Sequence, residues 1–337
     1  MSKGEFDIIK RYFQRSGTME ASTGVALSIG DDAAILDIPA GYQLAVTTDT
    51  LVSGVHFFDD VDPFRLGYKS LAVNLSDLAA MGAKAKWVSL AITLPDIDED
   101  WLQAFCRGFF ALADKYHVHL VGGDTTKGPL SITISAKGLV ESGKALTRQH
   151  AKAGDLICCS GSLGNGALGL AVKNAELKLS HSQFFVDALE ITEPRLTFAS
   201  LLPGLVSSCI DISDGLTQDL SHLLEQSQCH AEITLENLPL SEPMLDEIKH
   251  ANISLQQAWE FALMGGDDYE LLFTIPEANW DRLNSKMKAL GLTCFNIGRI
   301  TASTASVKGV LEEPYLRLTY HQQPVDLALS GWDHFKK

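Results

Sequence analysis

Hydrophobic residues follow two different spacings along the first half of the chain, which predicts a mixed α/β unit. Short apolar runs indicate strands, and longer segments with an apolar residue at every third or fourth position indicate helices. The predicted strands are residues 43–47 (QLAVT), 87–94 (WVSLAITL), 119–121 and 130–140 (LSITISAKGLV). The predicted helices are residues 63–81, which stop before the glycine at 82, and residues 98–116. We expect 43–47 to be a buried strand and the helices to cover the sheet.

The same alternation resumes after a polar connection at residues 141–154. The second half contains predicted strands at 155–160, 208–212, 231–235 and 269–275, and predicted helices near 167–174 and at 215–226. A chain of 337 residues is long enough for about two domains of roughly 150 residues each. We place the boundary near residue 145, which gives domains of residues 1–145 and 146–337, and the fold class is α/β.

Composition and charge indicate a folded protein and disfavour nucleic acid and membranes. Apolar residues make up 46% of the chain and charged residues 20%, which is ordinary for a globular protein and excludes a disordered one. The net charge of -15 repels a polyanion, so duplex nucleic acid is an unfavourable partner. No uncharged apolar run approaches the ~18 residues that span a bilayer. Phe6, Ile9 and Phe13 instead predict an amphipathic first helix, which is unlike a secretory signal.

The six cysteines indicate a reducing compartment. They form no CxxC pair and are scattered through apolar stretches, apart from the adjacent Cys158 and Cys159. We therefore expect reduced core residues in a cytoplasmic protein.

Aspartates beside glycine or hydroxyl residues recur where the predicted strands end. They stand in GDD (30–32), TTDT (47–50), GGDTT (122–126), DISDG (211–215) and GGDD (265–268). Asp77 adds one more, inside a predicted helix. One such motif is typical of a turn or a helix N-cap. Five in one chain indicate a ligand site, since α/β proteins bind ligands at strand ends.

Aspartates that converge need cations between them. Two carboxylates ~4 Å apart repel by about 4 kcal/mol at an effective dielectric near 20. Oxygen ligands without imidazole or thiolate partners favour Mg²⁺ over zinc, and such a site bridges substrate phosphates. Phosphoryl or nucleotidyl chemistry is thus favoured, without a P-loop or protein-kinase architecture, because neither set of motifs occurs. The run SGSLGNG at 160–166 is either a phosphate cradle or a plain strand-to-helix turn.

Eight motifs that cover almost the whole length resemble the thiamine-monophosphate kinase family, within the aminoimidazole ribonucleotide synthetase superfamily. They are IGDDAA (29–34), TTDTLVSGVHF (47–57), AVNLSDLAAMGA (72–83), LVGGDTT (120–126), ALTR (145–148), DISDGL (211–216), GGDDYEL (265–271) and GWDHF (331–335). The resemblance implies an N-terminal mixed sheet with helices on one face, which binds metal and nucleotide and forms the dimer, followed by a C-terminal α/β domain that completes the site. It also implies a cytoplasmic homodimer that phosphorylates thiamine monophosphate to thiamine diphosphate. The resemblance further implies that the γ-phosphate of ATP moves by direct in-line transfer, in the last step of thiamine diphosphate biosynthesis.

The resemblance also assigns roles to individual residues. The implied Mg²⁺ ligands are Asp32, Thr47, Thr48, Asp49, Asp77, Asp124, Asp211 and Asp214. The implied ATP contacts are Tyr116, Gly123, Asp124, Arg148 and Ser213. The implied substrate contacts are His56, Asp267 and Trp332. No general base is assigned, because a phosphate monoester with a second pKa of about 6 is already mostly deprotonated at pH 7.

One position departs from the family pattern, and three residues have alternative interpretations. The family reads GGED where this chain reads GGDD, so Asp267 is one methylene shorter than the usual glutamate. Because a carboxylate is kept, we expect function to be kept. His56 can alternatively be read as a core histidine. Trp332 can be read as an anchor for the C-terminal tail, and Arg148 as a residue of a surface ion pair.

Three other functions stay open on the sequence. Another ATP-dependent synthetase of the superfamily would share the metal site but lack the thiamine pocket. A non-catalytic sensor of Mg²⁺-nucleotide would bind without turnover. A metal-dependent phosphohydrolase would release phosphate without an acceptor.

Overall fold

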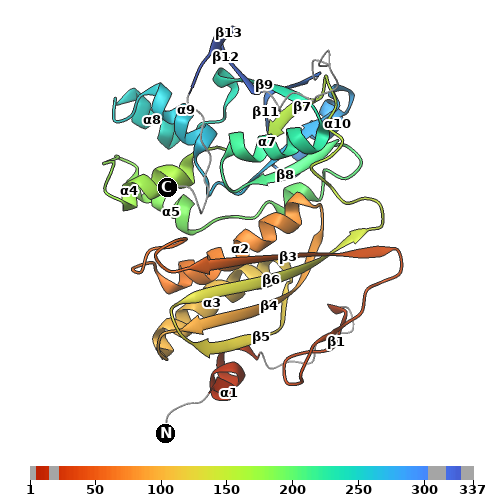
Figure 1. Cartoon of the computed structure of the whole chain (residues 1–337), viewed down its shortest axis with the longest axis vertical. Helices are drawn as coiled ribbons and strands as arrows, with labels where there is room; N and C mark the ends of the chain where they lie inside the picture. Colours follow the sequence, from red (N-terminus) through yellow and green to blue (C-terminus); the bar gives the residue numbers. More distant parts are fainter. Residues whose placement is uncertain (1–4, 15–22, 303–315, 328–337) are drawn as a thin grey trace, which may run out of the picture. The chain divides into compact units, whose positions relative to one another are not determined.

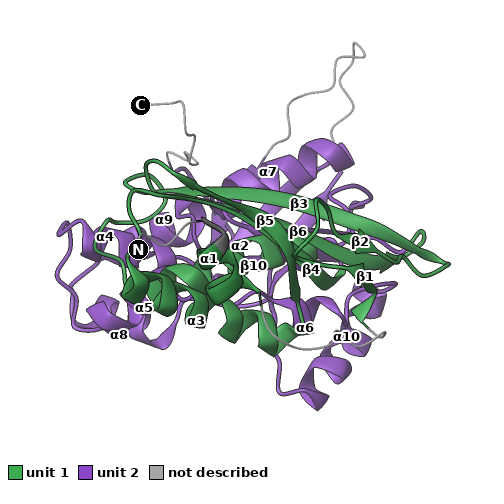
Figure 2. Ribbon diagram, turned by 90° about the horizontal axis from the view of Figure 1, so that it is seen from below, with its two compact units in different colours: residues 1–78, 83–143 green, residues 79–82, 144–337 purple. Residues whose placement is uncertain are grey.

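The structure is a computed structural model, and it describes residues 5–14, 23–302 and 316–327. The chain forms two compact units, residues 1–78 with 83–143 and residues 79–82 with 144–337 (Figure 2). None of the helices in the described part is long and apolar enough to cross a membrane. The functions that we expect of residues 1–145 and 146–337 stay predictions.

The first unit is a four-stranded mixed sheet with two helices on one face (Figure 1). Its elements are α1 Glu5–Ile8, the π-helix η1 Ile9–Phe13, β1 Val25–Leu27, β2 Ile35–Leu36, β3 Tyr42–Val52, α2 Pro63–Ala80, β4 Lys84–Leu94, α3 Glu99–Tyr116, β5 His119–Lys127 and β6 Ser131–Glu141. The strand order is β3-β6-β4-β5, in which β4 and β5 are parallel and the other neighbours antiparallel. The mixed sheet, its helical face, and the predicted helices α2 and α3 are confirmed.

Two glycines let α2 and α3 approach each other closely. A Cβ on Gly67 would lie 2.0 Å from the carbonyl oxygen of Phe105, and one on Gly108 would lie 1.8 Å from that of Phe64. The helices therefore touch backbone to backbone, which fixes α2 on the sheet. Asp98 begins α3 as its N-cap, accepting from two backbone N–H groups at 3.0 Å each.

The strand predicted at 43–47 is part of β3, but the prediction that it is buried is wrong. Leu44 is 41% exposed and Val46 60% exposed. Side chains alternate between the two faces of a strand. The odd-numbered residues of β3 face α2, whereas the even-numbered apolar residues lie on the face without helices. The small sheet β1–β2 covers part of that face, where it packs on Trp87.

Two aspartate motifs of the first unit, TTDT and GGDTT, lie inside strands, whereas we predicted them at strand ends; GDD at 30–32 lies between β1 and β2. β3 continues through the TTDT motif, and β5 continues through GGDTT to Lys127. Threonine is β-branched and favours strands, and hydrogen bonds from neighbouring strands outweigh the preference of aspartate and glycine for turns. The strand ends that we predicted from these residues are therefore wrong.

The second unit is a seven-stranded sheet of order β13-β12-β9-β11-β7-β10-β8, antiparallel except for the β12–β9 pair. Its elements are β7 Leu156–Cys159, α4 Asn165–Lys173, α5 Ser182–Glu190, α6 Leu196–Ala199, β8 Ser208–Ile212, α7 Leu216–Ser227, β9 His230–Thr234, the 3₁₀ helix η3 Leu235–Asn237, α8 Glu242–Lys249, α9 Leu255–Met264, β10 Glu270–Ile275, α10 Glu277–Ala289, β11 Phe295–Thr301, β12 Leu316–Tyr320 and β13 Gln323–Val325.

Both faces of this sheet are covered, which explains its continuous apolar runs. Ile157 and Cys159 of β7 belong to a core with α7 and α9. Leu156 and Cys158 belong to a second core with α6 and α10. A strand buried on both faces is apolar throughout rather than alternating. The six cysteines are free thiols, five of them buried, as expected for reduced core residues.

Candidate active site

Two residues of β3 bond two side chains of α2 in the first unit. The hydroxyl of Thr47 donates a hydrogen bond to the carboxylate of Asp77. The backbone N–H of Asp49 donates to the side-chain oxygen of Asn74 at 3.2 Å. Asn74 is one helical turn before Asp77, so both face the same strand. Two motifs 25 to 30 residues apart in sequence thus form one oxygen-rich cluster, which we call the β3–α2 cluster: Thr47, Asp49, Asn74 and Asp77.

The β3–α2 cluster carries more negative charge than its surroundings neutralise. Burial raises the pKa of Asp49 to about 6, and repulsion from Asp77 adds to the shift. Both effects disfavour the ionised carboxylate. A cation between Asp49 and Asp77 would reverse the second effect.

The open face of the same sheet holds two other predicted ligands. The side chain of Thr48 points away from Asp49, and it donates to the carbonyl oxygen of Thr47 at 2.8 Å. The register Thr50–Thr133–Ala91–Asp124 places Asp124 on this open face. Because β6 and β4 lie between β3 and β5, Asp124 is about 14 Å from β3. One sheet therefore does not gather Thr48, Asp49 and Asp124 around one ion through their side chains.

The remaining predicted residues of the first unit have local structural contacts. Asp32 is exposed, and its N–H donates to the Asp31 carboxylate at 2.9 Å. The Nδ1 of half-buried His56 accepts from the N–H of Val52 at 3.1 Å, which places the ring proton of the neutral form on Nε2.

Tyr116 and Gly123 also occupy structural positions in the first unit. Half-buried Tyr116 ends α3. A Cβ on Gly123 would lie 1.8 Å from the carbonyl oxygen of Leu90, so glycine is required there for packing alone. Their predicted roles in binding ATP stay predictions.

In the second unit, one buried carboxylate shapes the DISDG loop. Asp219 accepts from the backbone N–H groups of Ser213 at 3.0 Å and Asp214 at 3.1 Å, both at the same oxygen. Burial raises the pKa of Asp219 to about 7, with a contribution from Asp214, while Arg148 acts in the opposite direction. Arg148 thus lies near the loop that carries Ser213 and Asp214. Asp211 precedes this loop as a buried residue of β8.

The GGDD motif forms a tight loop against the DISDG loop. Asp267 donates from its N–H to the carbonyl oxygen of Ser213 at 2.9 Å, and Tyr269 donates to that of Ile212 at 2.7 Å. Asp267 and Tyr269 have left-handed backbones, with φ of 66° and 51°. Such conformations cost of order 1–3 kcal/mol each and persist only where surrounding contacts impose them.

The glycine-rich turn at 160–166 binds an internal carboxylate. Asp268 accepts from the N–H of Gly164 at 2.7 Å, and the N–H of Gly166 also bonds this carboxyl group. Gly164 is the N-cap of α4, so Asp268 occupies the positive end of that helix. Of the two interpretations of this turn, the structure supports the strand-to-helix turn, because Asp268 already takes the N–H groups that a phosphate would need.

Four polar residues that the sequence did not single out are Asn74 of the first unit and Asp219, Arg195 and Glu270 of the second. Asn74 and Asp219 lie on helices, where polar residues are usually solvated. Arg195 forms a two-point ion pair with buried Glu270, one bond of which, from Nε, measures 2.7 Å. The available signal was that Asn74 stands in the motif AVNLSDLAAMGA and Glu270 in GGDDYEL, but a motif alone does not distinguish a ligand from a loop anchor. Trp332 lies outside the described residues.

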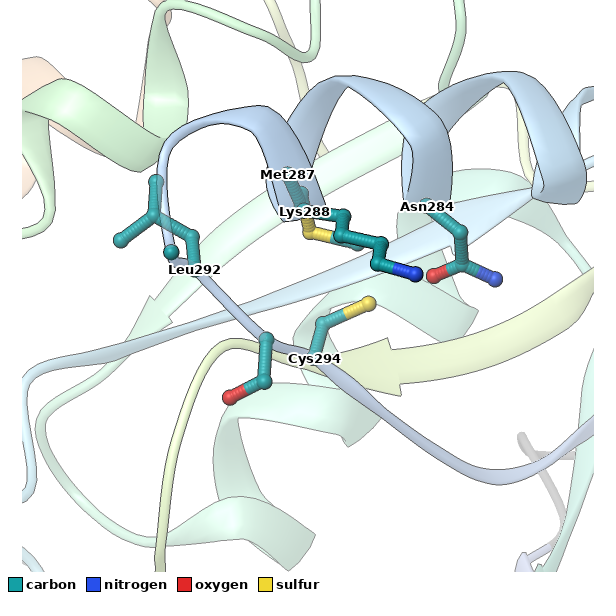
Figure 3. A pocket seen from close by; sticks show the side chains of 7 residues that line it. Asn284, Met287, Lys288, Leu292 and Cys294 are labelled. Atoms are coloured by element: carbon teal, nitrogen blue, oxygen red, sulfur yellow. The ribbon is translucent and has the colours of Figure 1, made fainter.

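A hollow of about 420 Å³ lies elsewhere in the second unit, beside the end of α10 (Figure 3). Its lining residues are Asn284, Met287, Lys288, Gly291, Leu292, Thr293 and Cys294. None of the predicted site residues lines it. The β3–α2 cluster of the first unit and the DISDG and GGDD loops of the second, rather than this hollow, are therefore the candidate functional regions.

The β3–α2 cluster fits a hard divalent cation. Among the described residues, no group of three or more His, Cys, Asp or Glu side chains is arranged to hold a metal ion. The cluster offers two carboxylates and a hydroxyl, and Mg²⁺ is commonly held by one or two carboxylates together with water and substrate phosphates. The uncompensated charge at Asp49 is the observation that favours a cation here.

Comparison with known proteins identifies the family. Models of the AIR synthase related protein match over residues 30–140 for the N-terminal domain and 152–309 for the C-terminal domain. The thiamine-monophosphate kinase of Haemophilus influenzae is 45% identical over 340 residues, covering 100% of this chain and 99% of that protein. That of Escherichia coli is 43% identical over 338 residues, covering 99% of each.

Solved structures agree in fold. The crystal structure of thiamine-monophosphate kinase from Stenotrophomonas maltophilia K279a has a TM-score of 0.78 and 40% identity, covering 90% of this chain and 92% of that one. AaThiL complexed with AMPPCP and TMP has a TM-score of 0.75 and 29% identity, covering 91% and 92%. The two predicted domains of the superfamily fold are thereby confirmed, and the full-length matches show that the chain belongs to the thiamine-monophosphate kinase family.

Proposed function

We propose that the protein transfers the γ-phosphoryl group of ATP to thiamine monophosphate, forming thiamine diphosphate and ADP. The observation that carries the proposal is the β3–α2 cluster in a chain whose full-length relatives are thiamine-monophosphate kinases. One solved relative is a complex with AMPPCP and TMP, which supports the same pair of substrates here.

The protein takes little covalent part in this reaction. An oxygen of the acceptor phosphate attacks the γ-phosphorus, the bond to the β-phosphate oxygen breaks, and ADP leaves with that electron pair. The acceptor is mostly ionised at pH 7, so binding and orientation of two anions are the main requirements. Arg148 provides a charge that phosphate binds, near the loop of Ser213 and Asp214.

Mg²⁺ is the cation that we propose for the β3–α2 cluster. Asp49 and Asp77 would hold it, with Thr47 adjacent, and the ion would neutralise phosphate charge when bound. Asp32, Thr48, Asp124, Asp211 and Asp214 remain proposed ligands of further ions. Tyr116, Gly123 and Ser213 remain proposed ATP contacts, and His56, Asp267 and Trp332 remain proposed substrate contacts.

A product assay tests the activity directly. The purified protein is incubated with ATP, Mg²⁺ and thiamine monophosphate, and thiamine diphosphate is measured as its thiochrome fluorescence. We expect product that depends on all three components. ATP turnover without this product would contradict the proposal. Phosphate release without acceptor would favour the phosphohydrolase. Nucleotide binding without turnover would favour the sensor. Turnover only with another acceptor would favour the synthetase of the superfamily.

We further propose that the protein is a homodimer in which a second copy covers the open face of the first unit. Tyr42, Leu44 and Val46 are 42%, 41% and 60% exposed along one side of β3. A bare apolar strip on an edge strand is typical of an association surface. Asp124 lies on the same face, so its carboxylate would face the second copy.

The mass in solution tests this proposal. Val46→Asp should convert the dimer to monomer in light scattering, because a carboxylate would be buried at the interface. Ile97→Asp is the matched control, since Ile97 is 45% exposed in the loop before α3. A monomeric wild-type protein would contradict the proposal.

We place the dimer in the cytoplasm, on the basis of its free cysteines.

A further inference from the structure

Asp268 and Asp267 are neighbours in sequence, yet their side chains have different surroundings. Asp267 belongs to the proposed substrate site. Asp268 is half-buried, and its carboxyl group bonds the N–H groups at the start of α4, Gly164 at 2.7 Å and Gly166. The mechanism above does not use Asp268.

The backbone of Asp267 is held against the same turn of α4. A Cβ on Gly166 would lie 2.5 Å from the carbonyl oxygen of Asp267. A Cβ on Gly265 would lie 2.4 Å from the Cβ of Ala167. The loop and the first turn of α4 are therefore in direct contact on both sides of Asp267.

The other attachment of the loop is to DISDG. The N–H of Asp267 bonds Ser213 at 2.9 Å, and that of Tyr269 bonds Ile212 at 2.7 Å. Asp268 lies between these two left-handed residues and supplies the attachment to α4.

We propose that Asp268 is a positioning residue, which binds the first turn of α4 and thereby fixes the direction of the Asp267 carboxylate toward the acceptor substrate. The proposal rests on the function proposed above. A loop pinned at both sides keeps a side chain in one orientation, and an orientation that is preset makes substrate binding stronger.

Asp268→Ala tests this role in the full-length protein. We expect the KM for thiamine monophosphate to rise about tenfold, with the KM for ATP changed less than twofold. Asp98→Ala is the matched control, because Asp98 also bonds two N–H groups of a helix N-terminus but lies in the first unit. It should lower the melting temperature and leave both KM values unchanged.

A double-mutant comparison separates positioning from general stability. If Asp268 acts through Asp267, adding Asp268→Ala to Asp267→Ala should change the KM for thiamine monophosphate by less than twofold. An equal tenfold rise in both backgrounds, or no rise in the single variant, would overturn the proposal.

Two further measurements keep the result decisive. If Asp268→Ala does not fold, Asp268→Glu replaces it. The longer side chain should displace the loop from α4 and raise the KM for thiamine monophosphate. An unchanged KM would overturn the proposal. Wild-type protein that forms no thiamine diphosphate would instead defeat the proposed function itself, so the two failures are distinguishable.

Discussion

The β3–α2 cluster and the loops of the second unit both depend on aspartates, but they use the carboxylates differently. In the first unit, Asp49 and Asp77 lie close enough to repel each other. In the second unit, the pKa of Asp219 is also raised, to about 7, by burial and by Asp214, but Asp219 and Asp268 accept hydrogen bonds from backbone N–H groups. Charge that is left uncompensated suits a cation, whereas an oxygen bound to the main chain shapes a loop.

This difference gives a test that applies to every aspartate of the motifs. Asparagine keeps an acceptor oxygen and removes the charge. It should therefore fail where the carboxylate holds a cation and succeed where one oxygen receives the N–H groups. The predictions below follow from this contrast, beginning with the largest effect.

Asp77→Asn should lower kcat at least ~100-fold, because the amide keeps the bond with Thr47 but loses the charge that a cation requires. Turnover is measured by thiochrome fluorescence, and circular dichroism checks the fold. Asp98→Asn, an exposed N-cap, is the control with unchanged turnover. Activity within threefold of wild type would remove Asp77 from the metal site.

Asp219→Ala should destabilise the second unit by about 2–3 kcal/mol, because two backbone N–H groups lose their acceptor. Asp219→Asn should cost less than about 1 kcal/mol, since one oxygen receives both bonds. Urea unfolding measures both variants, and the KM for ATP should rise only in the alanine variant. Equal losses of unfolding free energy in the two variants would show that the charge of Asp219 matters. Asp219 would then not differ from Asp49 and Asp77 in the way described.

Asp49→Asn should stabilise the metal-free protein by about 2–3 kcal/mol at pH 8 and by well under about 1 kcal/mol at pH 4. The pKa of Asp49 is raised from 3.8 to about 6 in the folded protein. The folded state therefore binds this proton more tightly, and the stability that it contributes is present below pH ~4 and lost as the pH rises through 6. Asparagine behaves like the protonated form.

Urea unfolding with a chelator present, at both pH values, measures that difference. Adding Mg²⁺ at pH 8 should stabilise the wild type more than the variant. A gain of the same size at pH 4 and pH 8 would show that repulsion and burial of the Asp49 charge are not its cause.

Asp267→Glu should have the smallest effect, a change of less than threefold in the KM for thiamine monophosphate. It restores the residue that is usual in the family and keeps the carboxylate, while the backbone remains fixed by Ser213. Steady-state kinetics measures it. A tenfold change would mean that the loop is too rigid to absorb one methylene group.

The sequence by itself determined the family, the mixed α/β class and most helices and strands. Long periodic segments such as α2 and α3 are set by local side-chain spacing, which the sequence shows directly. The motif residues were also visible, because aspartate beside glycine or threonine is a local pattern.

Tertiary structure alone decided what each aspartate does. Thr48 and Asp49 are adjacent in sequence but lie on opposite faces of β3, and Asp124 is three strands away. Asp268 bonds a helix start more than 100 residues before it. Strand register, burial and backbone hydrogen bonds are non-local, so neither composition nor spacing could distinguish a carboxylate that no backbone N–H group binds from one that holds a loop.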